Sequence, residues 1–174
     1  MKILLVVVSL VLGGGAGIDG ARALDQSPAL DLFSFVEGTV QATGIVQDRG
    51  GNVIQRFDVA IEGTVQGDRL VLDETFTYLQ GEGPTSRVWT IDRTDQGYVG
   101  SATDIPGPAI GRSFGNALNW TYVMDLPVGD RSFKVKFDDW FWALDERRLI
   151  NRSSLSKFGL RLADVTLYME RVER

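Results

Sequence analysis

The sequence predicts an all-β protein, an antiparallel up-and-down meander of about nine strands that closes into a β-barrel or half-barrel. Apolar and polar residues alternate over most of the chain, with no long stretch of helical periodicity. Short turn signals rich in Gly, Asp and Asn separate these segments, and short turns join antiparallel neighbours. A long meander removes its exposed edge strands by closing on itself. A two-sheet sandwich is the alternative architecture.

The composition excludes several kinds of site. The chain has 174 residues, a formal net charge of −5, and neither histidine nor cysteine. Disulfides, Cys/His zinc sites, thiolate catalysis and Ser-His-Asp triads are therefore excluded. The negative charge is opposite to that of a typical nucleic-acid binder, so we expect no nucleic-acid partner. No loop has EF-hand or phosphate-loop spacing, so we expect no metal site and no cofactor.

The N-terminus has the three parts of a secretory signal peptide. Lys2 supplies a positive charge, residues 3–12 form an apolar core, and Ala21-Arg22-Ala23 is a small-residue cleavage site. The apolar run is shorter than the about 20 residues that a membrane span needs. We therefore expect residues 1–23 to be removed. Residues 24–174 would then form a single β-barrel domain in the periplasm or outside the cell.

The elements follow one another without a domain boundary. Residues 32–36 are apolar and predict one helical turn or a plug before the first strand. Residues 105–117 form the one long interruption, and their glycines predict a flexible flap at the barrel mouth. The predicted strands cover residues 38–47, 53–66, 69–79, 86–93, 98–104, 118–126, 133–143, 149–155 and 160–171.

Three charged residues interrupt the apolar rows that would face the barrel interior: Glu74, Arg87 and Asp139. An unpaired buried charge is costly, so each needs a partner. Glu74 and Arg87 lie on strands joined by one turn, which predicts cross-strand neighbours and an ion pair. For Asp139 the predicted partner is Asn151 or Arg152, across its own hairpin.

These interior charges have two interpretations. They form structural pairs that fix the strand register, or they anchor the polar head of an otherwise apolar ligand. No catalytic residue is assigned. The candidate ligand-binding residues are Glu74, Arg87, Trp89, Asp104, Asn116, Trp120, Tyr122, Asp139, Asn151 and Arg152.

Two tryptophans are predicted to face away from the barrel interior. Trp140 and Trp142 alternate with Asp139 and therefore lie on the outer face of their strand. There they would form an exposed apolar patch suited to contact with a membrane or a partner protein.

Several motifs resemble a known bacterial family. They are LDETFTYLQGE at residues 72–82, RVW at 87–89, the segment 101–122, FDDWFW at 137–142, LINR at 149–152 and KFG at 157–159. Together they resemble the envelope family known as domain of unknown function 3833. The resemblance implies no activity and no catalytic residue.

The resemblance also bears on anchoring and ligand. Many members look like lipoproteins with a cysteine that closes the signal peptide, and this chain has no cysteine, which argues against lipid anchoring. Relatives encoded near lipid-modifying enzymes imply an acyl or lipid ligand. By analogy, the predicted fold is similar to the lipocalin class of barrels.

We therefore expect an exported periplasmic barrel that binds or carries a hydrophobic ligand, a lipid or acyl compound. One alternative is an enzyme on a lipid-like substrate, with Glu74 or Asp139 as general acid or base. Burial raises the pKa of a carboxyl group toward the neutral range that this role requires. The other alternative is a non-catalytic envelope protein that contacts its partner through Trp140 and Trp142.

Overall fold

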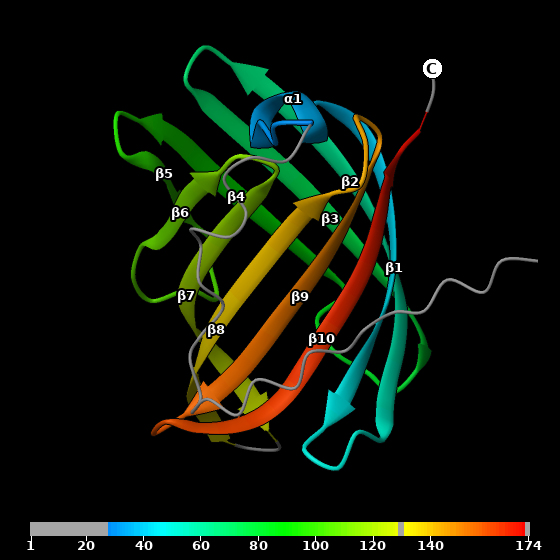
Figure 1. The fold of residues 1–174 in the computed structure, drawn as a ribbon. Helices are drawn as coiled ribbons and strands as arrows, with labels where there is room; N and C mark the ends of the chain where they lie inside the picture. The colour runs from blue at the N-terminus through cyan, green and yellow to red at the C-terminus, as the bar shows by residue number, and fades with distance from the viewer. Residues whose placement is uncertain (1–27, 129–130, 173–174) are drawn as a thin grey trace, which may run out of the picture.

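The chain forms a closed β-barrel. The computed structural model describes residues 28–128 and 131–172, so the predicted signal peptide lies outside the described residues. Ten antiparallel strands pair in chain order, and β1 pairs with β10 to close the barrel (Figure 1). The predicted up-and-down meander is therefore confirmed, with one strand more than expected.

One short helix precedes the strands. The elements are α1 (Leu32–Val36), β1 (Gly38–Asp48), β2 (Val53–Gln66), β3 (Arg69–Gln80), β4 (Ser86–Thr94), β5 (Gly97–Ser101), β6 (Ala109–Phe114), β7 (Ala117–Val128), β8 (Arg131–Ala143), β9 (Arg148–Lys157) and β10 (Leu160–Arg171).

The additional strand, β6, lies in the segment that was predicted to be a flexible flap, and that prediction is wrong. β6 pairs with both β5 and β7. This pairing could not be predicted because Gly100 of β5 and Gly111 of β6 stand at inward positions. The indole ring of Trp120 fills the space beside both glycines. A Cβ atom would lie 2.6 Å from the ring at Gly100 and 2.5 Å from it at Gly111. Because glycine takes the place of an apolar side chain at these two inward positions, the alternation of β5 and β6 is hard to see in the sequence.

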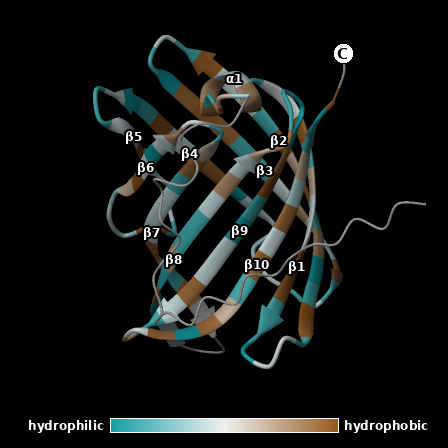
Figure 2. Cartoon of the chain, viewed as in Figure 1, coloured by the Kyte–Doolittle hydropathy of each residue, from teal (hydrophilic) through white to brown (hydrophobic). Residues whose placement is uncertain are grey.

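The strands alternate in hydropathy along their length (Figure 2), as the sequence predicts. Helix α1 lies at one end of the barrel (Figure 1), where β3, β7 and β9 begin. Leu70, Leu118 and Leu149 there are each at most 1% exposed. This end of the barrel is packed as an apolar core.

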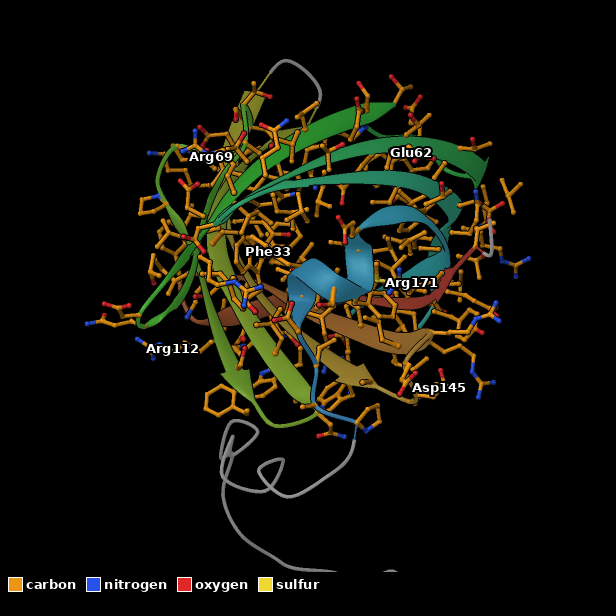
Figure 3. The ribbon with its side chains drawn as sticks, turned by 90° about the horizontal axis from the view of Figure 1, so that it is seen from above. Phe33, Glu62, Arg69, Arg112, Asp145 and Arg171 are labelled. Carbon is orange, nitrogen blue, oxygen red and sulfur yellow. The ribbon has the colours of Figure 1, made fainter. Side chains whose placement is uncertain are left out.

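Helix α1 closes that end, which confirms the predicted plug. The Asp31 side chain caps it by accepting a hydrogen bond from the backbone N–H of Ser34 at 2.9 Å. Phe33 points toward the barrel axis (Figure 3) and stacks on Tyr98, with ring centroids 5.6 Å apart. Gly63 allows the close approach, because a Cβ atom there would overlap the carbonyl group of Val36.

The C-terminal strand holds the helix in place. The Arg171 guanidinium donates hydrogen bonds to the carbonyl oxygens of Ser34 at 2.6 Å and Glu37 at 3.3 Å. The two ends of the described chain therefore meet at this end of the barrel. Among the residues that the structure describes, no helix combines the length and apolar character needed to cross a bilayer.

Candidate ligand-binding site

The barrel encloses a cavity of about 790 Å³. Leu32 and Val36 of α1 form its closed end. At the opposite end its lining includes Ile54, Glu82 and Pro84, which are exposed, so the cavity opens to the surface there. We refer to this open end as the mouth. The volume falls in the range of about 300–1,000 Å³ that is typical of small-molecule sites.

One side of the cavity is a cluster of four aromatic side chains, Trp89, Trp120, Tyr122 and Phe137, which we call the aromatic wall. The Trp89 ring meets Trp120 edge-on at 5.7 Å and Tyr122 edge-on at 5.3 Å. Tyr122 stacks on Phe137 at 4.8 Å. β4, β7 and β8 supply these residues, whose inward direction follows from the alternation in the sequence.

Arg87 forms an ion pair with Asp104 rather than with Glu74. Its Nε and Nη2 atoms donate to Asp104 Oδ2 at 3.0 and 2.8 Å. The guanidinium also lies 5.8 Å from the ring centroid of Phe76 and 5.9 Å from that of Trp89. Asp104 comes from the connection between β5 and β6, which has no periodic pattern. The sequence therefore predicts Asp104 as a candidate site residue but not its ion pair with Arg87.

Glu74 is the cross-strand partner of Arg87, as predicted, and both side chains line the cavity. Burial raises the pKa of Glu74 to about 7, and the neighbouring charge of Asp104 adds to this effect. The Arg87 guanidinium and the indole N–H of Trp89 act in the opposite direction on this pKa. The attraction of Arg87 therefore offsets only part of the rise in the pKa of Glu74 that burial causes.

Asp139 is buried in the cavity wall, with 6% of its surface exposed. Burial raises its pKa to about 7, and the hydroxyl groups of Ser153 and Tyr122 offset part of this shift. Its Oδ1 atom accepts no hydrogen bond from any residue in the described part of the chain. Asp139 therefore keeps an unused acceptor inside an apolar cavity.

The predicted partners of Asp139 lie elsewhere. Arg152 is exposed and pairs across the strands with Trp140, so it lies on the outer face and that prediction is wrong. Asn151 faces the cavity, where its amide donates to the carbonyl oxygen of Trp140 at 3.3 Å. Ser153, which the sequence analysis missed, is opposite Asp139. Its position two residues after Asn151 on one strand could have revealed it.

Of the ten candidate residues, eight line the cavity: Glu74, Arg87, Trp89, Asp104, Trp120, Tyr122, Asp139 and Asn151. Asn116 is buried in the turn between β6 and β7, next to the closed end, and is not part of the lining. Arg152 is the other residue outside it. The eight form one connected polar and aromatic surface inside the barrel.

Trp140 and Trp142 lie on the outer face of β8, as predicted, but they are half-buried. Their rings stack on each other at 6.1 Å, and Phe114 packs against Trp140 at 5.6 Å. This packing covers part of the surface that the sequence predicted to be an exposed patch.

The chemistry of the cavity follows from these side chains. Apolar walls can hold a hydrocarbon chain, and the carboxyl groups of Glu74 and Asp139 can accept hydrogen bonds or exchange protons near neutral pH. Within the described residues, no group of three or more acidic, His or Cys side chains is arranged to hold a metal ion. The cavity thus has the general form of a site for a small amphiphilic molecule.

Comparison with known proteins places the chain in a family. No curated protein matches it. Two solved structures that match are the S-type phycobiliprotein lyase CPES from Guillardia theta and the ywiB protein from Bacillus subtilis. The first is 10% identical over 82% of this chain and 91% of the other, with a TM-score of 0.49. The second is 15% identical over 78% of this chain and 91% of the other, with a TM-score of 0.32. Neither similarity is close enough to carry an inference. Residues 9–171 match the family described as "Protein of unknown function (DUF3833)", and the chain belongs to that family.

Proposed function

We propose that the protein is exported and that it binds or carries a hydrophobic ligand, a lipid or acyl compound, inside its barrel. The observation that carries this proposal is the cavity of about 790 Å³, closed by α1 and open at the mouth. A barrel that served only as a stable scaffold would gain from filling this space, because voids forfeit packing contacts.

Exposed apolar side chains around the mouth support the exchange of such a ligand with a lipid surface. Leu79 is 68% exposed, Leu160 60% and Phe158 93%, and all three lie at the mouth ends of their strands or in an adjoining turn. Exposed apolar groups gathered at one place are typical of contact sites for membranes or partners. This rim is a better candidate for membrane contact than Trp140 and Trp142, which are half-buried.

Native mass spectrometry tests the binding function. Protein purified from cells that produce the full-length chain is expected to carry a bound mass that organic extraction removes. The extracted protein should then bind n-decanol, with a change in the fluorescence of Trp89 and Trp120, which line the cavity. A ligand-free mass, together with no fluorescence response to decanol, would contradict the proposal.

A pair of matched variants links binding to the cavity. Ala163 lines the cavity and is half-buried, whereas Ala60 is exposed on the outer face of β2. Ala163→Phe places a ring in the cavity and is expected to weaken decanol binding by about tenfold or more. Ala60→Phe adds the same ring outside and should leave binding unchanged. Equal effects of the two substitutions would show that decanol binds elsewhere.

Export rests on the sequence of residues 1–23, and the mass of the mature protein tests it. Cleavage after Ala23 would leave a chain that begins at Leu24. Fractionation should find this form in the periplasm or the medium. A full-length mass confined to the cytoplasm would contradict export and leave the binding function to be judged by the experiments above.

The raised pKa values favour a second candidate, an enzyme that acts on a lipid-like substrate in the same cavity. Glu74 and Asp139 each have a pKa of about 7, which suits a general acid or base at neutral pH. Product analysis with acyl esters should then show turnover that falls about 100-fold or more in Glu74→Gln or Asp139→Asn. Activity retained in both variants would remove these residues from the mechanism.

A further inference from the structure

The charges that line the cavity are unbalanced. Among the described residues of the lining, five carry a carboxyl group and one carries a positive charge. The single cation, Arg87, lies 2.8 Å from Asp104 and is engaged by that partner. The other carboxyl groups belong to Glu74, Glu82, Asp125 and Asp139. A cleft lined by one sign of charge concentrates the opposite sign, so this cavity attracts cations and repels carboxylates and phosphates.

Asp139 keeps an unused acceptor inside the cavity. It is 6% exposed, and its Oδ1 atom accepts no hydrogen bond from any described residue. The hydroxyl groups of Ser153 and Tyr122 hydrogen-bond this carboxyl group, and the more weakly acting charges of Asp138 and Arg87 shift its pKa in opposite directions. A buried carboxylate without a cation is costly, and a ligand that brings a positive charge would offset this cost.

The aromatic wall lies beside the same carboxyl group. Trp120 is the cross-strand partner of Asp139, and Phe137 precedes Asp139 by two residues on the same face of β8. Glu74, Asp139 and Tyr122 all line the cavity, and burial, followed by the charge of Asp139, raises the pKa of Tyr122. Ring faces attract cations within about 6 Å, and aromatic cages are the usual sites for quaternary ammonium groups.

We infer that the ligand is an amphiphile whose polar end is a cationic nitrogen, held by Asp139 and Glu74 against the aromatic wall. This inference rests on the proposed binding function and narrows its ligand class. The hydrocarbon chain would occupy the apolar remainder of the cavity. An acyl compound with a free carboxylate would instead place a negative charge beside the carboxyl groups of Glu74 and Asp139.

The affinity for such a cation should depend on pH. The ionisable residues of the lining are Glu74, Tyr78, Glu82, Arg87, Asp104, Tyr122, Asp125 and Asp139. Of these, Asp125 alternates with the inward Tyr122 and Met124, so its side chain lies on the outer face of β7. Glu74 and Asp139 have pKa values raised to about 7 by burial. They gain negative charge as the pH rises from 6 to 8, so the binding of a permanently charged cation should tighten over that interval.

Three probes with the same chain length separate the possibilities: decyltrimethylammonium, n-decanol and decanoate, each below its micellar concentration. Calorimetry at pH 8 should show decyltrimethylammonium binding about tenfold or more tightly than decanol, and decanoate binding most weakly. Between pH 6 and pH 8 the cation should bind more tightly, while the affinity for decanol should stay constant.

Two neighbouring aspartates provide a matched control. Asp139→Asn removes the interior charge and should abolish the preference for the cation over decanol. Asp138→Asn removes a charge from the same strand but on the outer face, where Asp138 accepts a hydrogen bond from Asn119 at 2.7 Å, and should preserve that preference. If Asp139→Asn does not fold, Glu74→Gln is expected to reduce the preference in the same direction.

The outcomes distinguish this inference from the proposed function. If decanol and decanoate bind at least as tightly as the cation, the barrel binds apolar ligands but the inference is wrong. If Asp138→Asn and Asp139→Asn reduce cation binding equally, general charge attraction accounts for the preference and the interior site is wrong. If none of the three probes binds, both proposals fail.

Discussion

The two ends of the barrel are built from the same alternating strands but differ in what their inward rows contain. Near α1 these rows are aliphatic and aromatic, and Leu70, Leu118 and Leu149 are almost fully buried. Toward the mouth, carboxyl groups and a guanidinium interrupt the rows, and the interior is a cavity. The closed end thus resembles an ordinary core, whereas the other half gives up packing and keeps buried charges that are costly to the fold.

This difference separates the part of the sheet that stabilises the fold from the part that would hold the proposed ligand. The closed end can stabilise the fold because its inward side chains are almost fully buried. The cavity half can keep an unsatisfied acceptor at Asp139 because the closed end compensates for its cost. Substitutions at the two ends should therefore change different measurable quantities.

The largest expected effect is on stability at the closed end. Phe33 is 3% exposed and stacks on Tyr98, so Phe33→Ala should lower the free energy of unfolding by about 3–5 kcal/mol. Phe76 is half-buried and already borders the cavity, so Phe76→Ala should cost less, roughly 1–2 kcal/mol. Urea denaturation measures both losses. Equal losses would mean that the two ends contribute alike to stability.

A smaller effect concerns the pH dependence of stability in the cavity half. The pKa of Asp139 is about 7 in the folded protein, against a usual value near 4 in an unfolded chain. The folded state therefore binds more protons between these values, and this carboxyl group lowers stability as the pH rises. The expected slope is about 1 kcal/mol for each pH unit, levelling off above about pH 7.

Asp139→Asn removes this titration. The stability of the variant relative to the unmodified protein should rise between about pH 4 and pH 7 by that slope, as measured by denaturation at several pH values. Asp138→Asn, on the outer face of the same strand, leaves the buried carboxyl group of Asp139 in place and should therefore give a much smaller trend. A flat difference for Asp139→Asn would mean that Asp139 is not a buried titrating group.

The smallest expected effect is the coupling between Arg87 and its neighbours. A double-mutant cycle with Arg87→Met and Asp104→Asn should give a coupling energy of roughly 0.5–1 kcal/mol, because the ion pair is partly exposed. The cycle with Glu74→Gln should give less, because a carboxyl group with a pKa of about 7 is partly neutral at that pH. A larger coupling to Glu74 would restore the ion pair that the sequence predicted.

Which side chains face the barrel interior can largely be predicted from the sequence, because successive residues of a strand point to opposite faces of the sheet. Glu74, Arg87 and Asp139 face the cavity as their places in apolar rows predict. The same rule allows only one of Asn151 and Arg152 to face inward, and it is Asn151. The alternation fails at β6, where Gly111 stands under Trp120 in place of an apolar side chain.

Contacts that depend on irregular segments could not be predicted. Asp104 reaches Arg87 from the connection between β5 and β6, and no local pattern fixes where such a connection turns. The volume of the cavity is likewise absent from the sequence. It depends on how ten strands close together with one short helix, not on any single strand.

The seam between β1 and β10 has a consequence for how the protein folds. It joins the first and last strands, and the bond from Arg171 to Ser34 spans 137 positions of the chain. Contacts between such distant positions form slowly, because a long loop must be ordered before they bring any gain. While β10 is still inside the ribosome, the sheet of β1 to β9 has open edges at β1 and at β9 and encloses no cavity. The cavity is therefore enclosed only when the last strand pairs with the first.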